Sequence, residues 1–73
     1  MNNTFTYQML GRLQSDCEYV IHTTHCTRHL WGMTVNIHIT EMKRLYNSLE
    51  VKPEWLCPAD IAYYEKELRS LGI

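Results

Sequence analysis

The sequence TVNIHITEMKRLYNSL, residues 34–49, decides the fold, because its first half is compatible with two kinds of secondary structure. Apolar residues recur along it at spacings of three and four, which is typical of one face of a helix. These residues are Val35, Ile39, Met42, Leu45, Tyr46 and Leu49. From Met33 to Ile39, however, apolar and polar residues also alternate, which is typical of a strand. We favour a helix with Thr34 as its N-cap, because the helical spacing runs without a break to Leu49.

The strand alternative requires a second strand to pair with. Tyr19 to Thr24 is the only other β-leaning run in the chain. The alternative fold is therefore α+β, with a short hairpin around residues 19–39 that would enclose a His-rich loop. We favour the all-α fold over this α+β fold, because the helical spacing is unbroken to Leu49.

A first helix is predicted over residues 6–21, before the central stretch. Its apolar residues also recur at spacings of three and four, and they are Met9, Leu10, Leu13, Cys17, Val20 and Ile21. Thr4 or Thr6 is expected to provide the N-cap. The following residues, 22–32, are polar and rich in Thr and His, and we predict a loop there because β-branched Thr weakens a helix.

A last helix is predicted over residues 58–71. Pro53 restricts the residue before it to an extended conformation, so the central helix must end earlier. Pro58 suits the first position of a helix, Asp60 in the first turn opposes the helix dipole favourably, and Gly72 is a natural terminator. The chain is thus predicted to be a single all-α domain, residues 1–73, with three helices packed antiparallel through short connections.

The composition restricts the class of partner. The chain has 73 residues, 45% of them hydrophobic and 21% charged, which is typical of a folded domain. Seven basic residues face eight acidic ones, so the net charge is −1 and nucleic-acid binding through phosphates is not expected. The apolar runs are too short to cross a bilayer, so no membrane role is expected.

Cysteine usage and the first residues bear on the compartment. Three cysteines, Cys17, Cys26 and Cys57, cannot all pair within one chain, and the polar start Met1 to Thr4 is unlike a secretory leader. We therefore expect free thiols and a reducing cytoplasm. The sequence leaves the oligomeric state open and is compatible with a homodimer.

One cluster has the residue types of a metal site: His22, His25, Cys26 and His29. If the first helix continued, these positions would share one face, and imidazole and thiolate are preferred zinc donors. Adjacent His25 and Cys26, however, rarely both reach one ion, and the paired spacing of zinc fingers is missing. The simpler interpretation is a solvated polar loop, so no cofactor is expected and a zinc-stabilised or nucleic-acid-associated module is the alternative.

No catalytic group is predicted, so we expect a protein that is not an enzyme. A Cys–His pair needs a third orienting group and a pocket, and the three glycines are isolated rather than gathered in a phosphate loop. Trp anchors both cores and interfaces, and in so small a core packing is its more common role. A protein-binding surface is nevertheless a better interpretation of the remaining residues than an active site, because Trp and Arg are enriched in interfaces. The residues assigned to that surface are Arg28, Trp31, Lys43, Arg44 and Tyr63.

Several strings along the chain resemble one family. They are TFTY at 4–7, DCEY at 16–19, HLW at 29–31, HI at 38–39, MK at 42–43, LYNSL at 45–49, KPEWL at 52–56, DI at 60–61 and YE at 64–65. Together they are spread over nearly the whole chain. On these strings the chain resembles the eleventh member of the large polyvalent protein-associated domain series. The KPEWL and LW elements are the most specific parts of the resemblance.

The resemblance implies a small helical domain of phages, plasmids or conjugative elements, without associated catalytic residues. Such domains accompany functions delivered to a new host, including defence against restriction. The resemblance favours three helices over the hairpin. The chain departs from the family at HTTHCTR, residues 22–28, where a Gly- and Asn-rich loop is expected, so the His/Cys cluster is not a family signature.

Overall fold

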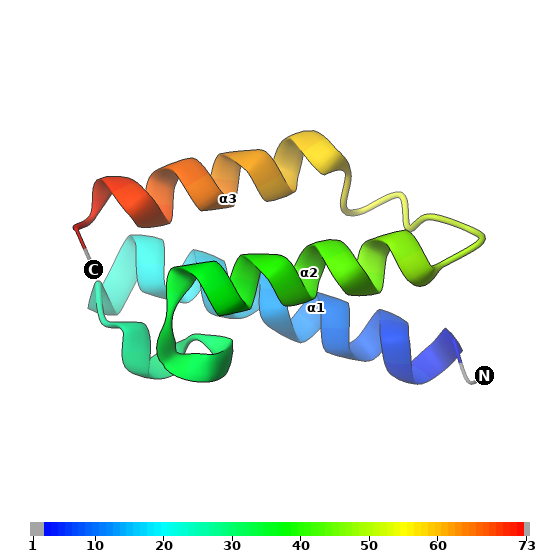
Figure 1. Cartoon of the computed structure of the whole chain (residues 1–73), viewed down its shortest axis with the longest axis horizontal. Coiled ribbons are helices and arrows are strands. Elements are labelled where there is room, and N and C mark those ends of the chain that lie inside the picture. Colours follow the sequence, from blue (N-terminus) through cyan, green and yellow to red (C-terminus); the bar gives the residue numbers. More distant parts are fainter. Residues whose placement is uncertain (1–2, 73) are drawn as a thin grey trace.

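Three α-helices form the protein in the computed structural model, which describes residues 3–72. They are α1 (Asn3–Tyr19), α2 (Val35–Ser48) and α3 (Pro58–Ser70), and consecutive helices run in opposite directions (Figure 1). No strand occurs within residues 3–72. The all-α prediction is confirmed, and the alternative with a hairpin around residues 19–39 is wrong.

Helix α1 begins and ends at different residues from those predicted. It starts at Asn3, so Thr6 is buried inside the helix and does not cap it. After Tyr19 the chain continues as a π-helical turn, η1 (Val20–Thr24), which is closed by a 3.0 Å hydrogen bond from the His25 amide to the Val20 carbonyl. The helical path therefore extends further into the His-rich segment than residue 21.

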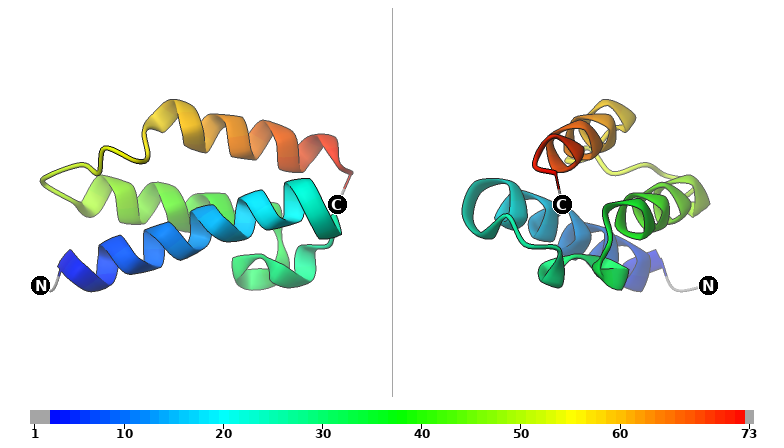
Figure 2. Two further views of the ribbon diagram at one scale, coloured as in Figure 1. Left: turned by 180° about the vertical axis from the view of Figure 1, so that it is seen from behind. Right: turned by 60° about the vertical axis from the view of Figure 1, so that its left-hand side comes forward.

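The rest of the predicted loop consists of two short 3₁₀ turns, η2 (Thr27–His29) and η3 (Trp31–Met33). Gly32 and Met33 both have positive φ angles, of 69° and 60°. Figures 1 and 2 show this segment beneath α1 and α2, on the side of the molecule away from α3. Leu30, between the two turns, is buried and fixes the segment to the core.

Helix α2 has the N-cap expected from the sequence. The Thr34 hydroxyl oxygen accepts a hydrogen bond of 3.1 Å from the Ile37 amide, which satisfies one unpaired donor of the first turn. Val35 and Ile39 are buried, whereas Met33 and Ile37 are exposed. In a strand all four of these alternating apolar residues would lie on one face. In the helix only Val35 and Ile39 pack into the core, so the alternation does not reflect a strand.

Helix α3 also begins where its residues predict. Pro58 occupies the first helical position, and the Cys57 amide donates to the Asp60 carboxylate over 3.1 Å. At the other end, Gly72 adopts a φ of 74° and its amide donates to the Arg69 carbonyl. Glycine reaches this left-handed conformation without steric cost, which makes it a suitable terminator.

The core lies where the three helices meet. It buries the apolar face of each helix together with residues of both connections, and its members are Leu10, Leu13, Cys17, Val20, Leu30, Val35, Ile39, Met42, Leu45, Leu49, Leu56, Ile61, Tyr64 and Leu68. Within residues 3–72 no helix combines the length and the apolar character needed to cross a membrane.

Candidate functional site

A cleft of about 420 Å³ lies between α1 and the segment that follows η1. Helix α1 contributes Met9, Arg12, Leu13 and Asp16, and residues 28–31 form the other wall. We call it the Trp31 cleft. Helix α3 contributes none of its lining. Figure 2 shows the segment that follows η1 on the side of α1 and α2 away from α3.

Trp31 is held in place although its side chain is half exposed. Its side chain is 47% exposed, whereas the preceding residue, Leu30, is buried in the core. The Trp31 amide donates a short hydrogen bond, 2.7 Å, to Nδ1 of His38. The Met33 amide in turn donates to the Leu30 carbonyl over 2.9 Å. The backbone beneath the indole is therefore fixed on both sides.

His38 is the residue that anchors this arrangement. It is fully buried, and its Nε2 atom lies 2.9 Å from the Leu13 carbonyl oxygen on α1. These partners assign the proton to Nε2, because Nδ1 accepts from the Trp31 amide. Burial lowers the pKa of His38 below its ordinary value, although the hydrogen bond to Leu13 and the charge of Asp16 act in the opposite direction. A neutral imidazole therefore links α1, η3 and α2.

Sequence reasoning did not assign a role to His38 as an anchor. A signal was nevertheless present, because His38 falls on the buried stripe of α2 together with Val35, Ile39 and Met42. A histidine on an apolar helical face needs a partner for each ring nitrogen once it is buried. The identity of those partners depends on tertiary packing.

The charged residues of the Trp31 cleft make no ion pairs with one another. Arg12, Asp16 and Arg28 have no salt bridge or side-chain hydrogen bond to any other residue within 3–72. Arg12 and Asp16 are four positions apart on α1, a spacing at which an ion pair is common, but they do not form one. Both guanidinium groups are therefore available to a ligand.

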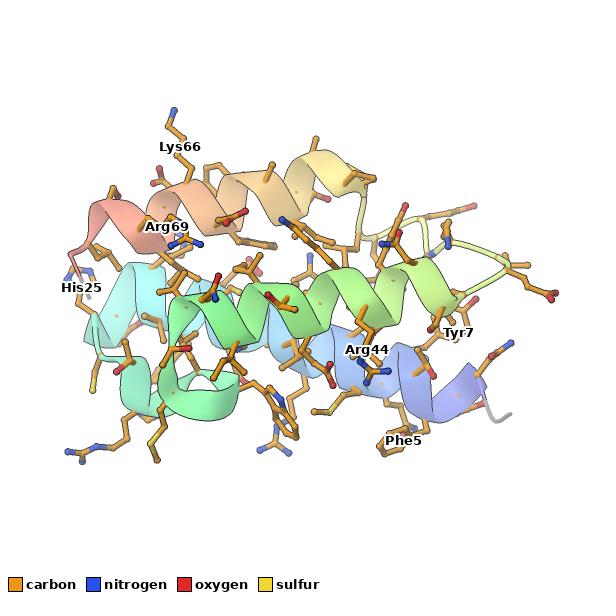
Figure 3. The ribbon with its side chains drawn as sticks, viewed as in Figure 1. Phe5, Tyr7, His25, Arg44, Lys66 and Arg69 are labelled. Atoms are coloured by element: carbon orange, nitrogen blue, oxygen red, sulfur yellow. The ribbon has the colours of Figure 1, made fainter. Side chains whose placement is uncertain are left out.

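Most other basic side chains are already engaged. Arg44 forms two hydrogen bonds with Glu41, of 2.6 and 2.8 Å, and Arg69 reaches Glu65 at 2.9 Å. Figure 3 shows Arg44 and Arg69 on different sides of α2. These contacts lower the pKa of both glutamates below the ordinary value. Lys52 is also engaged, since its ammonium group donates to the carbonyls of Tyr46 and Leu49 at the end of α2.

The five residues predicted to bind a partner do not form one surface. Arg28 and Trp31 share the Trp31 cleft. Lys43 lies 3.3 Å from Glu65 and lines a separate pocket of about 210 Å³ between α2 and α3. Arg44 is engaged with Glu41, and Tyr63 is half exposed on α3, where it packs edge-on against Tyr64.

The four predicted metal ligands are placed separately. His25 Nε2 lies 2.9 Å from the Ile21 carbonyl oxygen, and the His29 ring packs edge-on against Tyr19 with 5.0 Å between ring centroids. His22 is exposed and Cys26 is half-buried. Figure 3 shows His25 at the end of the bundle where η1 finishes. No three His, Cys, Asp or Glu side chains within the described residues are grouped to hold a metal ion.

Cys17, Cys26 and Cys57 form no disulfide with one another and lie in different environments. Cys17 is buried, Cys26 is half-buried and Cys57 is exposed. Burial, followed by the charges of Asp16 and Glu18, raises the pKa of Cys17 to about 12. A thiol that stays protonated is a poor nucleophile, and Cys17 instead packs in the core, with its sulfur 3.6 Å from that of Met42.

The family comparison agrees with the sequence pattern. The family described as large polyvalent protein-associated domain 11 matches residues 3–68 of this chain. No curated protein and no solved structure matches it. The match includes all of α1 and α2, the residues that form the Trp31 cleft, and most of α3.

Proposed function

Since the chain belongs to the large polyvalent protein-associated domain 11 family, we propose that it is a non-catalytic protein-binding domain of a mobile genetic element or phage. It would bind a host protein, such as a component of a defence system, or a protein of the same element. The binding surface would be the Trp31 cleft, and the setting would be the bacterial cytoplasm.

The observation that carries this proposal is the half-exposed indole of Trp31, whose backbone is held by a hydrogen bond to His38. Trp and Arg are the residues most enriched in interface hot spots, and a half-exposed indole offers a partner a large apolar contact area. A side chain whose backbone is already ordered loses less conformational entropy on binding. The hydrogen bond from the Trp31 amide to His38 provides that order.

Two further observations support binding rather than catalysis. Burial raises the pKa of Cys17 and of Tyr64 and lowers the pKa of His38, so burial favours the neutral form of all three, and backbone groups engage each ring nitrogen of His38. The charged side chains that line the Trp31 cleft are two arginines and one aspartate, and guanidinium groups are suited to recognising planar anions. The net charge of −1 disfavours a nucleic-acid partner.

The experiment is affinity capture from bacterial lysate with the wild-type chain and two variants. Trp31→Ala removes the indole from the Trp31 cleft. Phe5→Ala is the matched control, because Phe5 is also an exposed aromatic residue but lies near the start of α1, outside the cleft (Figure 3). We expect a specific partner that is retained by wild type and Phe5→Ala and lost by Trp31→Ala.

Folding of each variant is checked by circular dichroism and thermal unfolding before capture. A partner that is retained equally by all three proteins would show that binding does not use the Trp31 cleft. Turnover of a substrate by the purified chain would contradict the non-catalytic part of the proposal. Sedimentation of the free chain reveals whether a second copy occupies the cleft instead.

A further inference from the structure

We propose that the occupant of the Trp31 cleft is an acidic peptide segment in which an apolar side chain lies next to carboxylates. This inference rests on the proposed protein-binding function and names the chemistry of the partner. It is drawn from the two free arginines that line the cleft together with Trp31.

The first argument is the availability of positive charge. Arg12 and Arg28 come from opposite walls of the cleft and make no ion pair within the described residues. A guanidinium group matches a carboxylate with two parallel hydrogen bonds, which a lysine does not do. Two such groups on facing walls would each receive one carboxylate of an extended segment.

The second argument is the remaining charge of the site. Asp16 is the one carboxylate in the lining and Arg12 and Arg28 are its two guanidinium groups, so the charged side chains of the lining sum to +1. Its position four residues after Arg12 on α1 would allow an internal ion pair, which the structure does not form. An acidic ligand therefore does not have to displace an internal partner of either arginine.

The third argument is the apolar part of the lining. Met9 is half-buried and the indole of Trp31 is half exposed, so both present apolar surface at the cleft. A flexible thioether beside a fixed indole accommodates side chains of different shape. The apolar residue of the ligand would lie between them while its neighbours meet the arginines.

A nucleic acid would also bring negative charge and rings that stack on Trp, but the surface favours it less. Its affinity comes mainly from neutralising many phosphates along a basic track. Here Lys43, Arg44 and Arg69 are paired with glutamates, and the whole chain is net negative. Two free arginines are enough for a short acidic segment and too few for such a track.

The test is an NMR titration of the full chain with two synthetic peptides. One carries a leucine flanked by aspartate and glutamate, and the other replaces those acids by asparagine and glutamine. We expect the acidic peptide to shift the indole N–H of Trp31 and the side-chain N–H signals of Arg12 and Arg28. It should bind about tenfold more tightly than the amide peptide, and addition of salt should weaken it.

Three variants locate the effect. Arg12→Gln and Arg28→Gln should each lower the affinity for the acidic peptide about threefold and leave the amide peptide unaffected. Lys66→Gln is the control, because it makes the same change in net charge on α3, where Lys66 points away from the bundle (Figure 3). It should bind the acidic peptide like the wild type.

The outcomes separate this inference from the proposed function. Equal affinity for the two peptides, or no binding of the acidic one, would overturn the inference. A captured protein that requires Trp31 but binds Arg12→Gln and Arg28→Gln normally would also overturn it, and would leave the proposed function standing. If oligothymidylate shifts the same NMR signals and binds with higher affinity than the acidic peptide, both the inference and the proposed function are overturned.

Discussion

Nδ1 of His38 lies 2.7 Å from the backbone nitrogen of Trp31, so a buried side chain of α2 positions the aromatic residue of the cleft. The other ring nitrogen of His38 donates to the Leu13 carbonyl on α1. One imidazole therefore joins α1 to η3 and α2. The stability of the fold and the placement of Trp31 both depend on it.

Replacing His38 by alanine should destabilise the protein by about 2–4 kcal/mol. The change leaves a cavity in the core and removes the acceptor of the Trp31 amide. Urea unfolding measures the free energy difference. His22→Ala is the control, because His22 is exposed and should change stability by less than about 0.5 kcal/mol. Equal effects of the two substitutions would contradict the anchoring role of His38.

Stability should decrease as the pH falls below 6.5, and His38 should be the cause. Burial lowers the folded-state pKa of His38 below its ordinary value of 6.5, so the unfolded chain binds the proton more readily. The contribution is therefore fully present above pH 6.5 and is lost as the pH falls toward the folded-state pKa. Urea unfolding over a series of pH values measures this slope.

The same series in His38→Gln separates His38 from the carboxylates. The pKa values of Glu41 and Glu65 are lowered from 4.5 by their arginine partners, so their contribution is lost only below pH 4.5. We expect His38→Gln to remove the pH dependence of the free energy of unfolding just below pH 6.5 and to keep the dependence below pH 4.5. If the dependence just below pH 6.5 is unchanged in the variant, it comes from another titrating group.

Thr34→Ala should destabilise the protein by about 1 kcal/mol, because it removes the acceptor of the Ile37 amide at the start of α2. Thr34→Ser keeps the hydroxyl and should stay within about 0.5 kcal/mol of wild type. Thr40→Ala tests the same change inside α2 at an exposed position, where alanine is the better helix former and no loss is expected. Thermal and urea unfolding of the three variants provide the comparison.

Much of the helical framework follows from local rules. Thr34, Pro58 and Asp60 act at the helix starts as their types predict, because caps and first-turn residues interact with neighbours in sequence. The spacing of Val35, Ile39 and later residues correctly favoured a helix over a strand.

Other features depend on contacts that sequence spacing does not contain. The extension of α1 into η1 requires a hydrogen bond from His25 to Val20, five residues back, which no common helix signal predicts. Arg12 was not assigned to the site, because its neighbour across the cleft, Arg28, is brought there by tertiary folding. Lys43, Arg44 and Tyr63 looked equivalent to Arg28 in sequence, yet they lie elsewhere.

Gly32→Ala should be more harmful than Gly72→Ala. Both glycines have positive φ angles, 69° and 74°, so alanine is strained at each. A methyl group at position 32 would also overlap Cγ2 of Ile37 and lie 3.0 Å from its Cβ, whereas position 72 has open space. We expect Gly32→Ala to lower the free energy of unfolding by about 2–4 kcal/mol and Gly72→Ala to lower it by about 1 kcal/mol.

The overlap at position 32 is tested by a second substitution. Ile37 is half exposed, so Ile37→Ala alone should cost little, and in the Gly32→Ala background it should restore part of the loss. Strict additivity of the two substitutions would show that the contact between residues 32 and 37 is not the cause.

Hydroxyl-radical footprinting of the chain, free and in complex with its captured partner, tests the central claim most directly. Trp31 and Trp55 are 47% and 46% exposed in the free protein, so each is a control for the other. Docking on the Trp31 cleft predicts that oxidation of Trp31 is strongly reduced in the complex while that of Trp55 is unchanged. Protection of Trp55 with Trp31 still oxidised at its free rate would contradict the assignment of the cleft as the binding surface.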